Sequence, residues 1–292
     1  NAYEMLKFAL SQACITHTYL QQDPKIDDTF QKKFSALKDQ TASLQEVKTS
    51  ILILMQMMRD HYGKPVILLI DEYDVPIAKA SAKGYYPEML EVIKGLMSTA
   101  LKDNDAMRFA VITGCLRIAK ESIFTGTNNF VSDTISSSHL NEYFGFTQAD
   151  VDQILKDADC LEHAADIKNW YDGYHFGDLD VYCPWDVMNY VRDLQKDPQA
   201  KPASYWKNTS SNEIIRSFID YAGENVAEKL ERLLSGDFII QKIREDLTYD
   251  YLHSSEENLW SVLYLTGYLT LVRDTDLTQR PPKGSVALKI PN

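Results

Sequence analysis

The sequence predicts an α/β fold, because helical and strand patterns alternate in its first half. Residues 66–70 and 109–112 are short apolar runs rich in β-branched side chains, as in buried strands. An amphipathic helical pattern at residues 86–101 lies between them. A bounded, continuous apolar run fits a strand of a parallel sheet that is buried on both faces. We therefore expect a parallel sheet covered by helices.

Two helices are expected before the first strand. Residues 3–21 carry apolar side chains mainly at helical spacing. The pattern resumes at residues 44–58, behind Ser43, a candidate N-cap with Glu46 three positions later. The Gly63-Lys64-Pro65 sequence then ends this second helix.

The pattern changes after Gly145, where short helices and hairpins replace the strand and helix alternation. Helices that are followed by a β-hairpin suggest a winged-helix-like module. We therefore expect two domains, residues 1–145 and residues 146–292. In the second domain we expect helices at residues 147–155, 161–170, 184–194, 212–221, 225–234 and 258–265, a hairpin at 174–182, and strands at 268–273 and 285–290.

The composition is that of a globular protein and argues against strong nucleic-acid binding. The 292 residues are 45% hydrophobic and 25% charged, with a formal net charge of -12. Nucleic-acid-binding domains are usually basic as a whole. Most of the charge falls in residues 141–180, which hold ten acids and two lysines. This density is more typical of a solvated helical surface than of an acidic docking face.

The location that the sequence favours is cytoplasmic. Its four cysteines form neither a CxxC pair nor a disulfide framework, so reduced thiols are expected. The longest apolar runs have five residues, against about 18 for a membrane span, and no signal peptide is seen. The six histidines lack zinc-site spacing. The chain starts at Asn1 inside a helical pattern, which suggests a fragment.

Asp71 and Glu72 carry the strongest chemical signal, because they follow the first buried strand directly. Adjacent residues on a strand point to opposite faces, so the two acids could serve different tasks. In a nucleotide hydrolase, one acid holds the Mg²⁺ shell and the next activates the attacking water. This arrangement is that of a Walker B strand. The alternative is a strand that simply ends in polar residues.

Thr113 and Arg117 follow the second strand. If the two strands are neighbours, Thr113 would lie near Asp71 and could sense phosphate or align water, and Arg117 could approach an anionic oxygen. The alternatives are an ordinary hydroxyl at a strand end for Thr113 and a surface or interdomain ion pair for Arg117.

A phosphate-binding loop is missing from these 292 residues. Such a loop needs the pattern GxxxxGK[ST], whose amides cradle the phosphates. The only Gly-Lys, Gly63-Lys64, is followed by Pro65 and has Met58 at the position of the first glycine. The dinucleotide pattern GxGxxG is absent too.

The aromatic segment at residues 170–177, with Trp185 close behind, could stack on a base or pack a hairpin onto helices. Because the surrounding window is acidic, we expect core packing. A peptide or nucleic-acid binder would instead need exposed rings at Trp170, Tyr174 and Trp185.

Five motifs together resemble a known family. They are Leu-Ile-Asp-Glu-Tyr-Asp-Val-Pro-Ile at 69–77, Thr-Gly-Cys-Leu-Arg and the residues after it at 113–124, Asn-Asn-Phe at 128–130, Tyr-Phe-Gly-Phe-Thr at 143–147, and Trp-Tyr-Asp-Gly-Tyr at 170–174. In this order they resemble the AAA-ATPase-like proteins, which often carry a C-terminal PD-(D/E)XK nuclease domain.

The resemblance implies a partial P-loop NTPase domain of the ASCE/AAA-like kind, followed by a helical and winged-helix-like region. It implies that Asp71 holds Mg²⁺ through water, that Glu72 is the catalytic acid, and that Thr113 or Arg117 is a sensor. The implied parent protein is an ATPase that uses ATP and Mg²⁺ to control a nuclease domain or a partner. Its oligomeric state stays open.

Relative to the family, this chain lacks the P-loop segment and the nuclease domain. We therefore expect the fragment itself to be inactive and to bind nucleotide weakly or not at all. The alternative is a non-enzymatic, degenerate NTPase scaffold that acts through protein-protein contacts.

Overall fold

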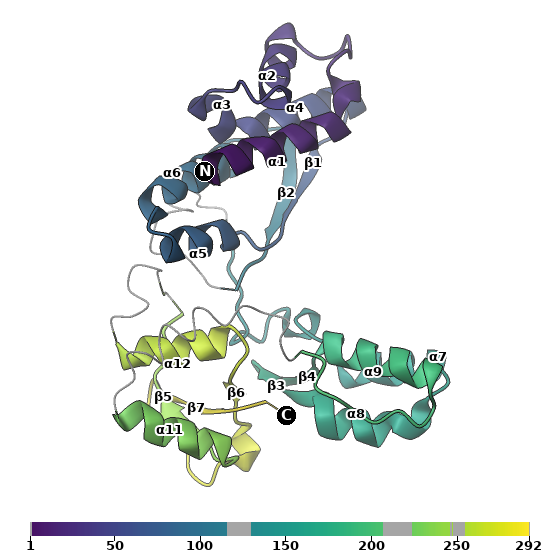
Figure 1. Ribbon diagram of the computed structural model, residues 1–292, viewed down its shortest axis with the longest axis vertical. Coiled ribbons are helices and arrows are strands. Elements are labelled where there is room, and N and C mark those ends of the chain that lie inside the picture. The colour runs from purple at the N-terminus through teal and green to yellow at the C-terminus, as the bar shows by residue number, and fades with distance from the viewer. Residues whose placement is uncertain (1, 116–129, 207–223, 246, 248–254, 292) are drawn as a thin grey trace. The chain divides into compact units, whose positions relative to one another are not determined.

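The computed structural model describes residues 2–115, 130–206, 224–245, 247 and 255–291 (Figure 1). These residues form helices and short sheets, so the predicted mixed α/β character is confirmed. The chain divides into two units, Asn1–Phe130 with Asp246–Asp250, and Val131–Glu245 with Tyr251–Asn292. The domain boundary expected at residue 145 stays a prediction.

The described residues of the first unit form a parallel pair of strands and several helices. Strand β1 pairs with β2 in a register that places Ile70 beside Ile112. Helix α4 contacts β1. In chain order the elements are α1 (Ala2–Thr16), the 3-10 helix η1 (Thr18–Leu20), α2 (Asp28–Lys38), α3 (Leu44–Lys48), α4 (Ser50–Tyr62), β1 (Val66–Ile70), α5 (Val75–Ala82), α6 (Tyr86–Leu101) and β2 (Met107–Ile112).

Local signals explain where several of these helices begin and end. Ser43 and Glu46 form the expected capping box at the start of α3. The single helix expected at 44–58 is two helices, because Thr49 departs from helical geometry between α3 and α4. Gly63 ends α4 in a left-handed conformation with φ 66°. Helices α2 and α5 were not predicted.

The expectation that the first strand is buried on both faces is wrong for the described structure. Along β1 the exposure alternates, and Leu69 is 72% exposed. On β2, Phe109 and Val111 are about half exposed. In the described part of the first unit, helices cover one side of a two-stranded sheet, and its core lies mainly between helices. Fully buried side chains there include Phe34, Val47, Met57, Ile77 and Ala100.

The second unit contains an antiparallel hairpin, a three-stranded antiparallel sheet and flanking helices. Strands β3 and β4 form the expected hairpin, and the order in the other sheet is β5-β7-β6. The expected helix at 212–221 lies outside the described residues. The elements are α7 (Gln148–Asp157), α8 (Ala164–Tyr171), β3 (Asp172–Phe176), β4 (Leu179–Tyr182), α9 (Pro184–Lys196), α11 (Glu224–Leu234), β5 (Ile239–Gln241), α12 (Glu256–Leu265), β6 (Thr270–Leu271) and β7 (Val286–Lys289), with 3-10 helices η2 (Asn141–Tyr143), η3 (Leu161–His163) and η5 (Asp274–Asp276).

Polar contacts attach the hairpin to the three-stranded sheet. The backbone N–H of His175 donates to Thr270 Oγ1 at 2.7 Å. The Tyr174 hydroxyl donates to the carbonyl oxygen of Gly267 at 3.0 Å. Because Thr270 is fully buried, this junction between β3 and β6 is part of the folded interior of the second unit.

The aromatic segment divides between core and surface. Tyr171, Phe176 and Tyr182 are buried, as core packing predicts. Trp170 and Trp185 are 47% and 49% exposed, so the prediction of core packing is wrong for these two rings. Across the described residues, no helix has the length and apolar character needed to cross a membrane.

Candidate functional site

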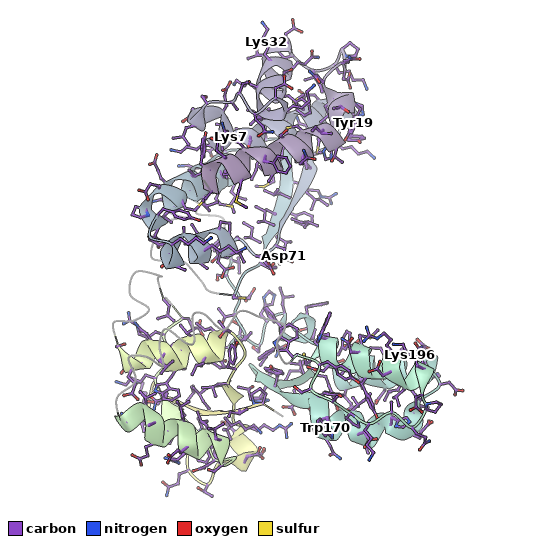
Figure 2. The ribbon with its side chains drawn as sticks, in the orientation of Figure 1. Lys7, Tyr19, Lys32, Asp71, Trp170 and Lys196 are labelled. Carbon is purple, nitrogen blue, oxygen red and sulfur yellow. The ribbon has the colours of Figure 1, made fainter. Side chains whose placement is uncertain are left out.

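The candidate site lies where β1 and β2 end side by side. Since Ile70 pairs with Ile112, the next residues of each strand, Asp71 and Thr113, are brought together. The backbone N–H of Thr113 donates to the carbonyl oxygen of Ile70 at 2.8 Å. The Thr113 hydroxyl donates to Oδ1 of Asp71. Figure 2 shows Asp71 at this end of the strands. The expected proximity of Thr113 to Asp71 is therefore present.

Glu72 leaves the strand in an unusual conformation. Strand β1 ends at Ile70, and Glu72 has φ 52°, in the left-handed region. The expectation that Asp71 and Glu72 alternate along a strand is therefore wrong, since neither belongs to the strand. The Glu72 N–H donates to Asp71 Oδ1 at 2.9 Å. Such a conformation costs about 1–3 kcal/mol in a non-glycine residue. The residue is exposed.

Further contacts connect the segments that follow the two strands, and the sequence predicted no role for the residues that form them. Asp74 is 3% exposed, and its Oδ1 accepts from the backbone N–H of Cys115 at 3.3 Å. A Cβ on Gly114 would come within 2.6 Å of the Tyr73 ring and 2.7 Å of Asp74 Oδ1. A side chain at position 114 would therefore displace the Tyr73 ring or the Asp74 carboxylate. Asp74 lies in the motif at 69–77 and Gly114 in the motif at 113–124. Their place in these motifs was the sequence signal that could have identified them.

The local electrostatic potential is negative. Burial raises the pKa of the Cys115 thiol, and the carboxylates of Asp74, Glu72 and Asp71 raise it further. Within the described residues, neither Asp71 nor Glu72 forms an ion pair. Two exposed carboxylates and a threonine hydroxyl are hard oxygen donors of the kind that Mg²⁺ prefers. The donor set therefore fits a magnesium ion.

The described residues do not form a complete metal cage. No group of three or more His, Cys, Asp or Glu side chains among them could hold a metal ion. Mg²⁺ usually takes one or two carboxylates and completes its shell with water and substrate phosphates.

Arg117, the other candidate sensor, lies outside the described residues. Gly63, the glycine of the only Gly-Lys pair, is the residue that ends helix α4. It therefore has a structural role there, and residues 58–64 do not form a loop that could cradle phosphate.

Part of this chain is similar to known proteins. Residues 1–124 match the model of a family described as AAA-ATPase-like, predicted AAA-ATPase. The N-terminal part of the chain is therefore similar to this family. This part includes both strands and the residues Asp71, Glu72 and Thr113.

A bacterial relative extends the similarity beyond this part. A protein of Azotobacter chroococcum mcd 1, named "Uncharacterized protein in vnfD 5'region", is 28% identical over 215 residues. The match covers 72% of this chain and 37% of that protein, so the chain matches little more than a third of the relative's length. No solved structure matches this chain.

Proposed function

We propose that the first unit supplies the part of an ATPase site that handles metal and water. The observation that carries this proposal is the hydrogen bond from Thr113 to Asp71 at the paired ends of two parallel strands. It supports the proposal because the carboxyl ends of parallel strands are where α/β sheets bind ligands. The family match to residues 1–124 adds independent support.

Each residue has a different role in this proposal. Asp71 holds Mg²⁺ through a water molecule, and the Thr113 hydroxyl fixes the orientation of the Asp71 carboxylate. Glu72 orients the attacking water and accepts its proton. The bound ion would neutralise charge on the phosphate oxygens. Arg117 is a second candidate for the sensor role.

The complete activity also needs a phosphate-binding loop, and no GxxxxGK[ST] pattern occurs in these 292 residues. We therefore propose that the 292-residue chain alone binds ATP weakly and that the whole protein couples ATP hydrolysis to the control of a partner or a nuclease domain. The sheet β5-β7-β6 with helices α11 and α12 supports a winged-helix-like role for the second unit.

The decisive variant is Glu72→Gln in the full-length natural protein. It should abolish ATP hydrolysis and leave ATP binding intact, because the amide is nearly isosteric but cannot accept the proton. Glu88→Gln is the matched control, since Glu88 is an exposed glutamate on α6. Unchanged hydrolysis in Glu72→Gln would remove Glu72 from the mechanism.

The proposal that the 292-residue chain alone binds ATP weakly has a separate test. Calorimetric titration of the 292-residue chain with ATP and Mg²⁺ should give little heat. Micromolar affinity would contradict this part of the proposal.

A non-enzymatic, degenerate NTPase scaffold that acts through protein-protein contacts is the second candidate. On this alternative, the full-length protein would lack ATPase activity even with Glu72 intact. Loss of activity on Glu72→Gln would therefore exclude the scaffold function.

A further inference from the structure

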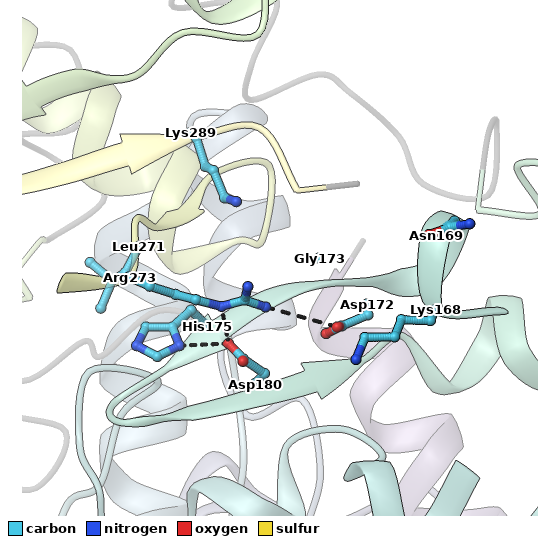
Figure 3. Close-up of a pocket in the computed structure, with 9 residues that line it drawn as sticks. All are labelled: Lys168, Asn169, Asp172, Gly173, His175, Asp180, Leu271, Arg273 and Lys289. Atoms are coloured by element: carbon cyan, nitrogen blue, oxygen red, sulfur yellow. Dashed lines mark hydrogen bonds and ion pairs between the residues drawn. The ribbon is translucent and has the colours of Figure 1, made fainter. Parts of the chain in front are cut away.

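A cavity of about 210 Å³ lies in the second unit, where the β3-β4 hairpin meets strands β6 and β7 (Figure 3). Its charged lining comes from segments that are far apart in the sequence. Lys168 lies on α8, Asp180 on β4 and Lys289 on β7, and Arg273 lies two residues after β6. Asp172 and His175 lie on β3.

One carboxylate of the cavity is already matched by positive charge. Arg273 Nε donates to Asp180 Oδ1 at 2.8 Å, and His175 Nδ1 lies 2.8 Å from the same oxygen. Burial acts to raise the pKa of Asp180, but the hydrogen bonds from Arg273 and His175 outweigh it and hold the pKa below its usual value. Asp180 is therefore ionised at neutral pH and fixes the Arg273 guanidinium.

The second carboxylate is less favourable as an anion. The Asp172 side chain is 9% exposed, and its Oδ2 lies 3.8 Å from a terminal nitrogen of Arg273. Burial, followed by the nearby charge of Asp180, raises the pKa of Asp172. At 3.8 Å the contact is an ion pair but not a hydrogen bond. Within the described residues, Nε is the only Arg273 nitrogen that donates a hydrogen bond, so its terminal N–H groups can still serve a ligand.

Lys168 and Lys289 bring additional positive charge to the cavity. Neither lysine forms an ion pair with another described residue, although both act electrostatically on Asp172. Figure 3 shows them on different sides of the Arg273 guanidinium. The three cationic side chains outnumber the two carboxylates. This excess stands out because residues 141–180 of the same unit carry ten acids and only two lysines.

We propose that this cavity binds a small phosphate monoester, with the phosphate between Lys168, Arg273 and Lys289. Arginine offers paired donors that match phosphate oxygens, and lysine adds compact charge. The volume lies below the range of roughly 300–1,000 Å³ for sites that hold drug-sized ligands. A phosphate with a small organic group fits this space better than a whole nucleotide.

The acidic surroundings also favour a small ligand over a nucleic acid. An extended polyanion would run beyond the cavity and meet the acidic surface of residues 141–180. A compact dianion meets only the cavity itself.

The test is calorimetric titration of the 292-residue chain with glycerol 3-phosphate and, separately, with inorganic phosphate at constant ionic strength. Both should bind, and each of Lys168→Gln and Lys289→Gln should weaken binding about tenfold, as expected for one charged hydrogen bond. Lys201→Gln is the matched control, because Lys201 is an exposed lysine of the same unit that does not line the cavity. It should leave the affinity unchanged.

Three results would overturn the proposal. They are the absence of binding at millimolar phosphate, equal weakening by all three lysine variants, and tighter binding of a single-stranded oligonucleotide that depends on the same two lysines. Circular dichroism of each variant checks that the fold is retained. The proposal is independent of the ATPase role, because its residues all lie in the second unit.

Discussion

Replacing Leu69 with alanine should destabilise the 292-residue chain only slightly. Leu69 is 72% exposed, so little more than a quarter of its surface is buried. Full burial of a leucine side chain contributes about 1.5–3 kcal/mol, and the matching fraction is about 0.4–0.8 kcal/mol. A strand buried on both faces would instead lose about 2–5 kcal/mol, because a cavity would remain.

The control for this variant is Leu96→Ala, which makes the same chemical change at a residue that is 5% exposed on α6. It should cost about 2–5 kcal/mol. Urea unfolding followed by circular dichroism gives both values, and measurement at two protein concentrations detects self-association through the exposed sheet face. Equal losses in the two variants, independent of concentration, would refute the conclusion that this face of the sheet is uncovered.

Three further changes test other parts of the structure. Gly177→Ala should cost about 1–3 kcal/mol in urea unfolding, because Gly177 has φ 60° and its Cβ would come within 2.5 Å of a backbone carbonyl oxygen; a loss below the error of the method would contradict the turn geometry. Hydrogen bonds in the capping box of α7 hold the pKa of Asp150 below 3.8, so its contribution to stability is present above that pH and is lost as the pH falls through the lowered value. Between about pH 5 and about pH 3, the Asp150→Asn variant should therefore lose less stability than the natural chain in urea unfolding. Parallel curves of unfolding free energy against pH for the two proteins would contradict this role of Asp150. Glu72→Gln should speed the alkylation of Cys115 at fixed pH, because one of the charges that raise the thiol pKa is removed. Mass spectrometry measures the rate, and an unchanged rate would show that the Glu72 charge does not act on the Cys115 thiol.

Short-range patterns determined which elements form. The apolar runs at 66–70 and 109–112 correspond to β1 and β2, and Ser43 with Glu46 marks the start of α3. Helix α2 was missed because few of its 11 residues are apolar, although Phe30, Phe34 and Leu37 recur at helical spacing. Helix α5 begins directly after the acidic motif, with Pro76 in its first turn as the local signal.

The site at the strand ends could be predicted in part. The sequence places Asp71 and Thr113 directly after two strands, and parallel pairing then brings them together. The left-handed turn at Glu72 and the close approach of Gly114 to Tyr73 could not be predicted, because both depend on how the chain leaves the sheet.

The sequence by itself determined the α/β class, the two strands and the acids that follow the first of them, because these depend on neighbouring residues. Only the tertiary structure decided that one face of the sheet is exposed, since a continuous apolar run looks the same whether helices cover one face or both. It also decided that Lys168, Arg273 and Lys289 line one cavity. Residues so far apart in the chain meet only when the hairpin packs on the β5-β7-β6 sheet, and no local pattern records that contact.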